Sequence, residues 1–243
     1  MHHCNLRAWR GIEFAHDSAA SAALLLMESH MFDFAAARET MLDSQIRTSD
    51  VTDERIQAAF LAVPREKFLP ITKSALAYSD GHVDIGGGRI MIKPRDIAKM
   101  IDAADIKPTD IVLNIACGRG YSAAVLAHMA ETVVALESSE ELAETATQHI
   151  DRCDVTNAAV IHADLKAGAA EHGPYDVIFV GGAVSCIPAP WFAQLALGGR
   201  LVAAITDGPI CRVKIFTKSA DSIGERTVFD TGMPTLPGFE PKK

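Results

Sequence analysis

Short, continuous apolar runs alternate with amphipathic segments over the second half of the chain. The following runs predict strands: 111–116, 132–138, 158–164, 177–182 and 200–205. Several of them are continuously apolar, which is typical of strands buried on both faces. The intervening segments predict helices at 121–130, 139–150 and 190–197. Strands and helices that alternate in this order indicate an α/β fold, with a mostly parallel sheet covered on both faces.

The pattern changes at both ends of this core. Residues 211–219 and 225–232 alternate polar and apolar positions, which predicts an antiparallel hairpin at the sheet edge. Earlier in the chain, Thr52 is expected to cap a helix that ends at Pro64. A second helix is expected over 94–104, with Pro94 in its first turn.

A strand, a tight glycine turn and a helix follow one another in VLNIACGRGYSAAVLA, residues 112–127. Ligands of open α/β sheets bind beyond the carboxyl ends of the strands, where glycine lets the backbone approach closely. The spacing Gly118-x-Gly120-x-x-Ala123 matches a dinucleotide fingerprint, with Glu137 as the acid that binds the ribose. This frame predicts an NAD-dependent oxidoreductase.

The same turn also fits an adenosyl group. In that frame the turn is Ala116-x-Gly118-x-Gly120, and Glu137 accepts hydrogen bonds from both ribose hydroxyls. Asp164, at the end of the next strand, is placed to accept from the adenine amino group. Each acid alone is more often a solvated carboxylate, but suitable groups at successive strand ends favour a cofactor site.

The amino-acid composition argues against several classes of binding partner. The chain has 23 basic and 31 acidic residues and a formal charge of −8, which is unfavourable for binding nucleic acid. Its 49% hydrophobic content supports a sizeable core, yet no apolar run reaches the roughly 18 residues that a membrane span needs. The histidines show no metal-binding spacing. The five cysteines are scattered, which favours a reducing compartment and a cytoplasmic protein.

Several segments, in order, resemble one family. They are MLDSQIRTSDVTDERI, VPREKFLP, ALAYSD, VLNIACGRGYSAAVLA, VVALE, PYDVIFVGGA, IP and QLALGGRLV. In these segments, from about residue 36 to residue 205, the chain is similar to the protein-L-isoaspartate O-methyltransferase family, which uses S-adenosyl-L-methionine. The oxidoreductase interpretation explains neither the segments before the glycine turn nor the C-terminal hairpin.

The resemblance implies a role for each matching position in the cofactor site. The expected cofactor-binding residues are Asn114, Ala116, Cys117, Gly118, Gly120, Glu137, Asp164 and Leu165. The turn would surround the methionine part, Glu137 would bind the ribose, and Asp164 with Leu165 would line the adenine pocket. The family usually has an acid in place of Asn114 and glycine in place of Ala116. We expect the lost negative charge at Asn114 to weaken cofactor binding.

The stretch IGGGRIMIKP, residues 85–94, is called the glycine loop below. In the family, this position typically reads I-G-x-G-Q-T-I-S-x-P and binds the acceptor. Here Ile90 and Ile92 replace the threonine and the serine, so the catalytic residues stay unknown. Gly88, Arg89 and Lys93 are the candidate substrate-binding residues, because backbone amides or either basic group can hold a carboxylate. The alternative is that both isoleucines pack inward and both basic groups face water.

The resemblance therefore implies a Rossmann-like methyltransferase fold and methylation of isoaspartyl carboxylates in damaged proteins or peptides, which is protein repair. The alternatives are the NAD-dependent oxidoreductase, and a methyltransferase-like protein with another acceptor or without catalytic activity. We expect residues 1–30 to be a disordered arm, or a wrongly assigned extension before a start at Met31. Residues 31–105 would form a helical lead-in with the acceptor loop, residues 106–243 the methyltransferase core, and 31–243 one domain. The oligomeric state is not predicted.

Overall fold

The apolar runs of the second half of the chain form the parallel strands of one sheet, with the half-exposed β5 at its edge. The computed structural model describes residues 33–208 and 210–241, so the expectation for residues 1–30 lies outside the described residues. The strands are β1 (Val83–Gly86), β2 (Arg89–Met91), β3 (Ile111–Ile115), β4 (Thr132–Glu137), β5 (Ala158–His162), β6 (Tyr175–Val184), β7 (Leu195–Asp207), β8 (Ile210–Lys218) and β9 (Ile223–Thr231).

Within the described residues, two α-helices precede the first strand, and four lie between later strands. They are α2 (Phe34–Met41), α3 (Glu54–Ala62), α4 (Pro94–Ala104), α5 (Tyr121–Ala127), α6 (Glu140–Arg152) and α7 (Ala189–Gln194). The predicted helix over 94–104 is confirmed with both ends as expected, and Pro94 is its first residue. The predicted cap at Thr52 is wrong by one residue, because the Asp53 side chain accepts the hydrogen bond from the amide of Arg55.

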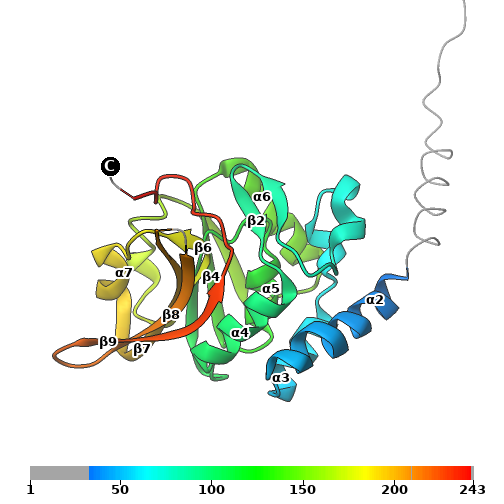
Figure 1. Ribbon diagram of the computed structural model, residues 1–243. Helices are drawn as coiled ribbons and strands as arrows, with labels where there is room; N and C mark the ends of the chain where they lie inside the picture. Colours follow the sequence, from blue (N-terminus) through cyan, green and yellow to red (C-terminus); the bar gives the residue numbers. More distant parts are fainter. Residues whose placement is uncertain (1–32, 209, 242–243) are drawn as a thin grey trace, which may run out of the picture. The chain divides into compact units, whose positions relative to one another are not determined.

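The main sheet has seven strands in the order β5-β4-β3-β6-β7-β8-β9. The strands from β5 to β7 pair in parallel, whereas β7–β8 and β8–β9 pair in an antiparallel way. The predicted edge hairpin is therefore confirmed, and its two strands lie at the lower left of Figure 1. The order reverses between β3 and β6, which places the carboxyl ends of β3 and β4 beside a topological switch point.

Alternate residues of each central strand enter different layers of the core. Val112 packs with the helices α3, α4 and α5 on one face, and Leu113 and Ile115 pack with Trp191 of α7 on the other. Figure 1 shows α4 and α5 on the opposite side of the sheet from α7. Burial on both faces is why these strands read as continuous apolar runs.

A small antiparallel hairpin, formed by β1 and β2, was not predicted from the sequence. It forms its own two-stranded sheet, and its turn is the glycine run of the glycine loop. Gly86, Gly87 and Gly88 all have positive φ, at 89°, 59° and 69°. The run is thus a tight turn between strands, a conformation that glycine adopts without steric cost.

The described part of the chain contains no helix that is both long enough and apolar enough to cross a bilayer.

Candidate functional site

The turn after β3 is buried at the carboxyl edge of the sheet. Ala116 and Gly118 have φ of 58° and 59°, and Gly120, which caps α5, has φ of 94°. This left-handed conformation suits glycine but costs an L-residue such as Ala116 about 1–2 kcal/mol. Gly181 of β6 lies directly against the turn, because a Cβ atom there would be 2.3 Å from the carbonyl oxygen of Ala116. The turn is therefore held close to the neighbouring strand.

Glu137, the last residue of β4, has its carboxylate directed at this turn. Its side chain is fully buried, and Oε2 accepts a hydrogen bond of 3.0 Å from the amide of Gly118. Oε1 accepts from the amides of Ser138 and Ser139, at 2.7 Å and 3.1 Å. The structure thus brings two of the predicted cofactor residues together. It also gives Glu137 backbone donors that keep its position fixed.

Arg89 of the glycine loop completes the environment of Glu137. Its Nε donates to Oε2 at 3.1 Å, and its Nη2 donates to Oε1 at 2.9 Å, which makes a bidentate pair. Nη2 also donates to the hydroxyl of Ser138 at 2.8 Å. The Arg89 side chain is 4% exposed. The alternative in which Arg89 faces water is therefore wrong for this structure, and its pairing with an acceptor carboxylate stays a prediction.

The other predicted cofactor residues are placed less directly. Ala163 follows β5, and its amide donates to the carbonyl of Glu137 at 3.1 Å, so the ends of β4 and β5 are adjacent. Asp164 is exposed and accepts from the amide of Lys166. Leu165 is buried, and its carbonyl accepts from the indole of Trp191 at 2.7 Å. Leu165 is therefore part of the core on the α7 face of the sheet. The carboxylate of Asp164 has no side-chain partner among the described residues.

Asn114 lies within β3 and is fully buried. Its Oδ1 accepts from the hydroxyl of Ser122 at 2.7 Å, and its Nδ2 donates to the carbonyl of Phe179 at 3.3 Å. Both ends of the amide are thus used inside the protein. The asparagine links β3 to α5 and β6, and its role toward the cofactor stays a prediction.

Cys117 is buried within the turn, where its thiol has little tendency to ionise. Burial, and then the nearby negative charge of Glu137, raise the pKa of the Cys117 thiol well above its usual range. A thiol with a raised pKa is a poor nucleophile. Cys117 is therefore suited to filling the turn and not to covalent chemistry.

The glycine loop covers the turn and is held from several sides. A Cβ atom on Gly118 would lie 2.7 Å from Cδ1 of Ile85, and one on Gly88 would lie 2.5 Å from Cγ of Pro237. Pro237 belongs to the C-terminal segment that pairs with the end of β6, where Leu236 donates to the carbonyl of Ala183 at 2.8 Å. The loop therefore packs between the glycine turn and the C-terminal segment.

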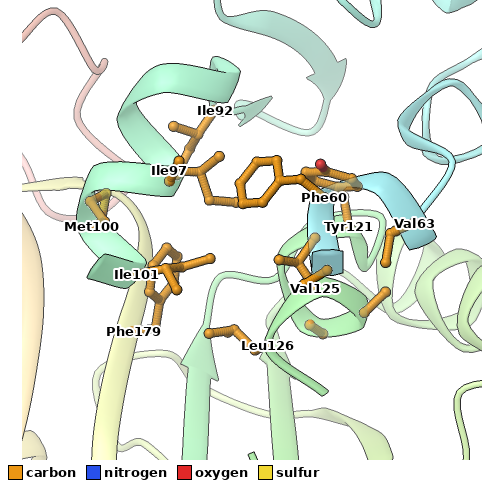
Figure 2. Packing of buried hydrophobic residues seen from close by; sticks show 14 of the residues in the cluster. Phe60, Val63, Ile92, Ile97, Met100, Ile101, Tyr121, Val125, Leu126 and Phe179 are labelled. Atoms are coloured by element: carbon orange, nitrogen blue, oxygen red, sulfur yellow. The ribbon is translucent and has the colours of Figure 1, made fainter. Parts of the chain in front are cut away.

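The two isoleucines at the hydroxyl positions face the core. Ile92 is 4% exposed and belongs to the apolar cluster between the helices and the sheet, and the half-buried Ile90 packs against the same cluster. Figure 2 shows Ile92 beside Ile97 in this cluster, near the rings of Phe60 and Tyr121. The expectation of inward packing is confirmed for both isoleucines.

A buried arginine that the sequence did not reveal supports this part of the loop. Arg65 is fully buried, donates from Nε to the carbonyl of Ala77 at 2.6 Å, and donates from Nη2 to the carbonyl of Ile92. Its guanidinium lies 4.7 Å from the centre of the Tyr121 ring. VPREKFLP marked this segment by family resemblance, but no local pattern distinguishes a buried arginine from an exposed one.

Lys93 ends the loop in a cluster of charged groups. Its Nζ lies 3.7 Å from Asp80 and 3.9 Å from the buried Asp96, and its backbone amide donates to Nδ1 of His82 at 3.1 Å. Burial, as the main cause, lowers the pKa of His82, although Asp96 opposes the shift. Lys93 therefore pairs loosely with the chain's own acids and does not simply face water. Its role toward an acceptor stays a prediction.

The chemical groups at the carboxyl edge of the sheet are of the types that bind an adenosyl cofactor. They include a buried carboxylate, a turn with left-handed backbone conformations, and Gly181 packed against that turn. In this structure the glycine loop is packed onto them. The remaining cavity of about 20 Å³, lined by Ile85, Ile90, Cys117 and Tyr121 among others, has room for about one water molecule. Small-molecule pockets are roughly 300–1,000 Å³.

The fold agrees with what similar proteins show. The family model described as protein-L-isoaspartate(D-aspartate) O-methyltransferase matches residues 36–232. The protein-L-isoaspartate O-methyltransferase of Koribacter versatilis (strain Ellin345) is 36% identical over 197 residues, which cover 81% of this chain and 88% of that protein.

Solved structures give the same result. A protein-L-isoaspartate O-methyltransferase structure superposes with a TM-score of 0.73 at 28% identity, over 83% of this chain and 66% of that one. A Plasmodium falciparum protein, solved in complex with S-adenosyl-L-homocysteine, superposes with a TM-score of 0.71 over 84% of this chain and 98% of that one. Because the second is 21% identical, it shows the fold alone.

Proposed function

The chain belongs to the protein-L-isoaspartate(D-aspartate) O-methyltransferase family, and we propose on that basis that it is an S-adenosyl-L-methionine-dependent carboxyl methyltransferase. Its acceptor is the free carboxylate of L-isoaspartyl residues in proteins or peptides. The observation that carries the proposal is the placement of Glu137 against the glycine turn at the switch point of the sheet. That is where an open α/β sheet binds a nucleoside-containing ligand.

The proposed cofactor site combines one carboxylate with the glycine turn. Glu137 would accept from the ribose, the turn from Ala116 to Gly120 would hold the methionine part, and Asp164 with Leu165 would line the adenine pocket. The exposed carboxylate of Asp164 and the buried Leu165 next to it support this division, because adenine needs both a polar edge and an apolar face. Asn114 would lie behind the turn, and its neutral side chain would offer no negative charge to the ammonium group of the cofactor.

Bound S-adenosyl-L-methionine supplies the methyl group, and the acceptor carboxylate is already a nucleophile at neutral pH. The protein therefore has to orient the carboxylate and exclude water, and it needs no general base. The apolar lining of the glycine loop, with Ile90 and Ile92 facing inward, supports water exclusion. Arg89, which the loop carries, supports carboxylate binding because its planar guanidinium matches a carboxylate bidentately.

The test is transfer of a labelled methyl group to a peptide that contains one L-isoaspartyl residue. The matched control is the same peptide with an ordinary aspartyl residue. We expect base-labile label on the isoaspartyl peptide alone, and loss of that label in Glu137→Gln. Label on neither peptide, from protein whose melting temperature S-adenosyl-L-homocysteine raises, would reject the acceptor and leave the cofactor assignment in place.

A second candidate function is a methyltransferase with another acceptor, or a protein that binds the cofactor without catalysis. The observation that favours it is the replacement of both loop hydroxyls by Ile90 and Ile92, which cannot hydrogen-bond a carboxylate. Ile90→Thr with Ile92→Ser separates the two. Gain of isoaspartyl methylation would show that the loop limits the reaction, and no gain in folded protein would favour another acceptor. A thermal shift with NAD and none with S-adenosyl-L-homocysteine would instead support the oxidoreductase.

We further propose that the protein repairs damaged proteins in the cytoplasm. The scattered cysteines support a reducing compartment, and the formal charge of −8 disfavours nucleic acid as a partner. The division into a lead-in over residues 31–105 and a core over 106–243 also stays a proposal. Immunodetection in separated cell fractions, together with isoaspartyl content in cells that lack the protein, would test location and repair.

A further inference from the structure

The carboxylate of Glu137 has no free acceptor position in this structure. A carboxylate offers about four lone-pair sites. Three backbone amides, of Gly118, Ser138 and Ser139, and two N–H groups of Arg89 all donate to it at 3.1 Å or less. A ribose diol, which would donate two further hydrogen bonds, therefore has to replace existing donors before Glu137 can bind it.

Arg89 is the donor that can leave. The three amides belong to the turn and to the start of α6, and they move only if the core moves. Arg89 instead belongs to the β1–β2 hairpin, which is separate from the main sheet and turns through three consecutive glycines with positive φ. Glycine gives such a turn access to alternative backbone conformations at little cost. The tip of the hairpin can therefore change conformation and release Arg89 while Glu137 stays in place.

Two further features of the hairpin indicate that the described arrangement is a closed one. Ile85 is packed onto Gly118, and the space left beside it is about 20 Å³. In addition, Nη1 of Arg89 is buried and has no hydrogen-bond partner among the described residues. A buried guanidinium with unused donors is not at its best-satisfied position. It gains from an arrangement in which all its donors are paired.

We propose that Arg89 competes with the cofactor for Glu137, so that the glycine loop acts as a gate on cofactor binding. This inference rests on the proposed function. While Arg89 holds Glu137, the loop lies over the turn and keeps the ribose-binding carboxylate occupied. When Glu137 accepts hydrogen bonds from the ribose instead, the guanidinium of Arg89 becomes free to bind the acceptor carboxylate. The acceptor therefore binds after the cofactor, and the same arginine serves two carboxylates in turn.

The test is calorimetric titration of S-adenosyl-L-homocysteine into the wild type, Arg89→Gln and Arg89→Lys. Glutamine is the residue that the family typically has at this position, and it cannot ion-pair with Glu137. Lysine keeps the charge but loses the bidentate fork. The control is Arg95→Gln, which removes one positive charge from a side chain that has no contact with Glu137 among the described residues. Melting temperatures without ligand establish that each variant is folded.

We expect Arg89→Gln to bind S-adenosyl-L-homocysteine at least about fivefold more tightly than the wild type, which is the lower end of typical coupling between two sites. Arg89→Lys should fall between the two, and Arg95→Gln should match the wild type. Equal or weaker binding by both Arg89 variants, with binding by the wild type intact, would overturn the gate alone. If no folded variant binds, the proposed cofactor use is rejected, and the gate with it. Should Arg89→Gln fail to fold, Arg89→Lys decides the result.

Discussion

Replacement of Ile92 by serine restores the hydroxyl that the family has at this position, but the structure predicts that it costs stability. Ile92 is 4% exposed and packs in the main apolar cluster, beside Ile97 in Figure 2. Its backbone carbonyl also accepts a hydrogen bond from the buried Arg65. The side chain is thus part of the core, although the sequence places it in a loop.

The size of the loss follows from burial. Truncation of a buried isoleucine to alanine removes three carbons and typically costs about 2–5 kcal/mol. We expect Ile92→Ala to lower the unfolding free energy by about 3 kcal/mol. The small cavity nearby indicates that the surrounding side chains would not fill the space that the mutation leaves. Ile92→Ser should lose about 1 kcal/mol more, since its hydroxyl is buried unless it finds a partner. Ile92→Val should lose only about 1 kcal/mol.

Urea unfolding followed by fluorescence measures these differences, with equal m-values as the check that the unfolded state is unchanged. In a domain of this size a loss of 3 kcal/mol lowers the melting temperature by about 6–12 °C. A loss below about 1 kcal/mol for Ile92→Ala would refute the reasoning, because it would mean that the loop does not pack as described. So would equal losses for the valine and alanine variants.

Three further predictions test other parts of the site. Asn114→Asp should lower the unfolding free energy by about 2 kcal/mol, because a carboxylate oxygen would replace the amide that donates to the carbonyl of Phe179. The same variant should bind S-adenosyl-L-homocysteine more tightly, and an unchanged calorimetric Kd would count against Asn114 lying near the cofactor's ammonium. Ala116→Gly should leave the unfolding free energy unchanged or raise it by about 1 kcal/mol, because glycine removes the left-handed strain, whereas Ala124→Gly in α5 should lower it by about 1 kcal/mol in the same urea titration. Finally, burial lowers the pKa of His82 in the folded protein, so the unfolded chain takes up the proton first. Stability should therefore fall as the pH drops below about 6.5 and level off below the folded pKa. His82→Asn, which keeps an acceptor for the Lys93 amide, should flatten this part of the curve, and an equally steep fall would assign the effect to another group.

The elements of the core were predictable because the burial of each one is visible in its local pattern of apolar residues. The runs at 111–116 and 177–182 are apolar at every position or nearly so, which only a strand buried on both faces requires. The helix over 94–104 begins with proline and places Ile97, Met100 and Ile101 on one face. The strand order, by contrast, was not predicted, because alternation of strands and helices does not fix it.

The contacts of the glycine loop were not predictable, because they join residues far apart in the chain. Arg89 meets Glu137 across 48 positions, and Arg65 meets the Ile92 carbonyl across 27. No local pattern indicates either partner. The glycine run predicts a loop, because consecutive glycines allow positive φ and close approach to a ligand. The β1–β2 hairpin forms all the same, because the side chains of Val83, Ile85 and Met91 are buried beneath it.

The departures from the family pattern within the glycine loop are physically linked. Arg89 in place of glutamine provides a buried counter-ion for Glu137, and that pair draws the loop onto the glycine turn. With the loop in this position, the next side chains point into the core, where isoleucine is favoured and a hydroxyl would be left without a partner. Substitutions that share one packed arrangement are not additive. Restoring Thr and Ser alone would therefore place two hydroxyls in the apolar cluster while Arg89 still holds Glu137, so the loop hydroxyls can act on an acceptor only after Arg89 has left that carboxylate.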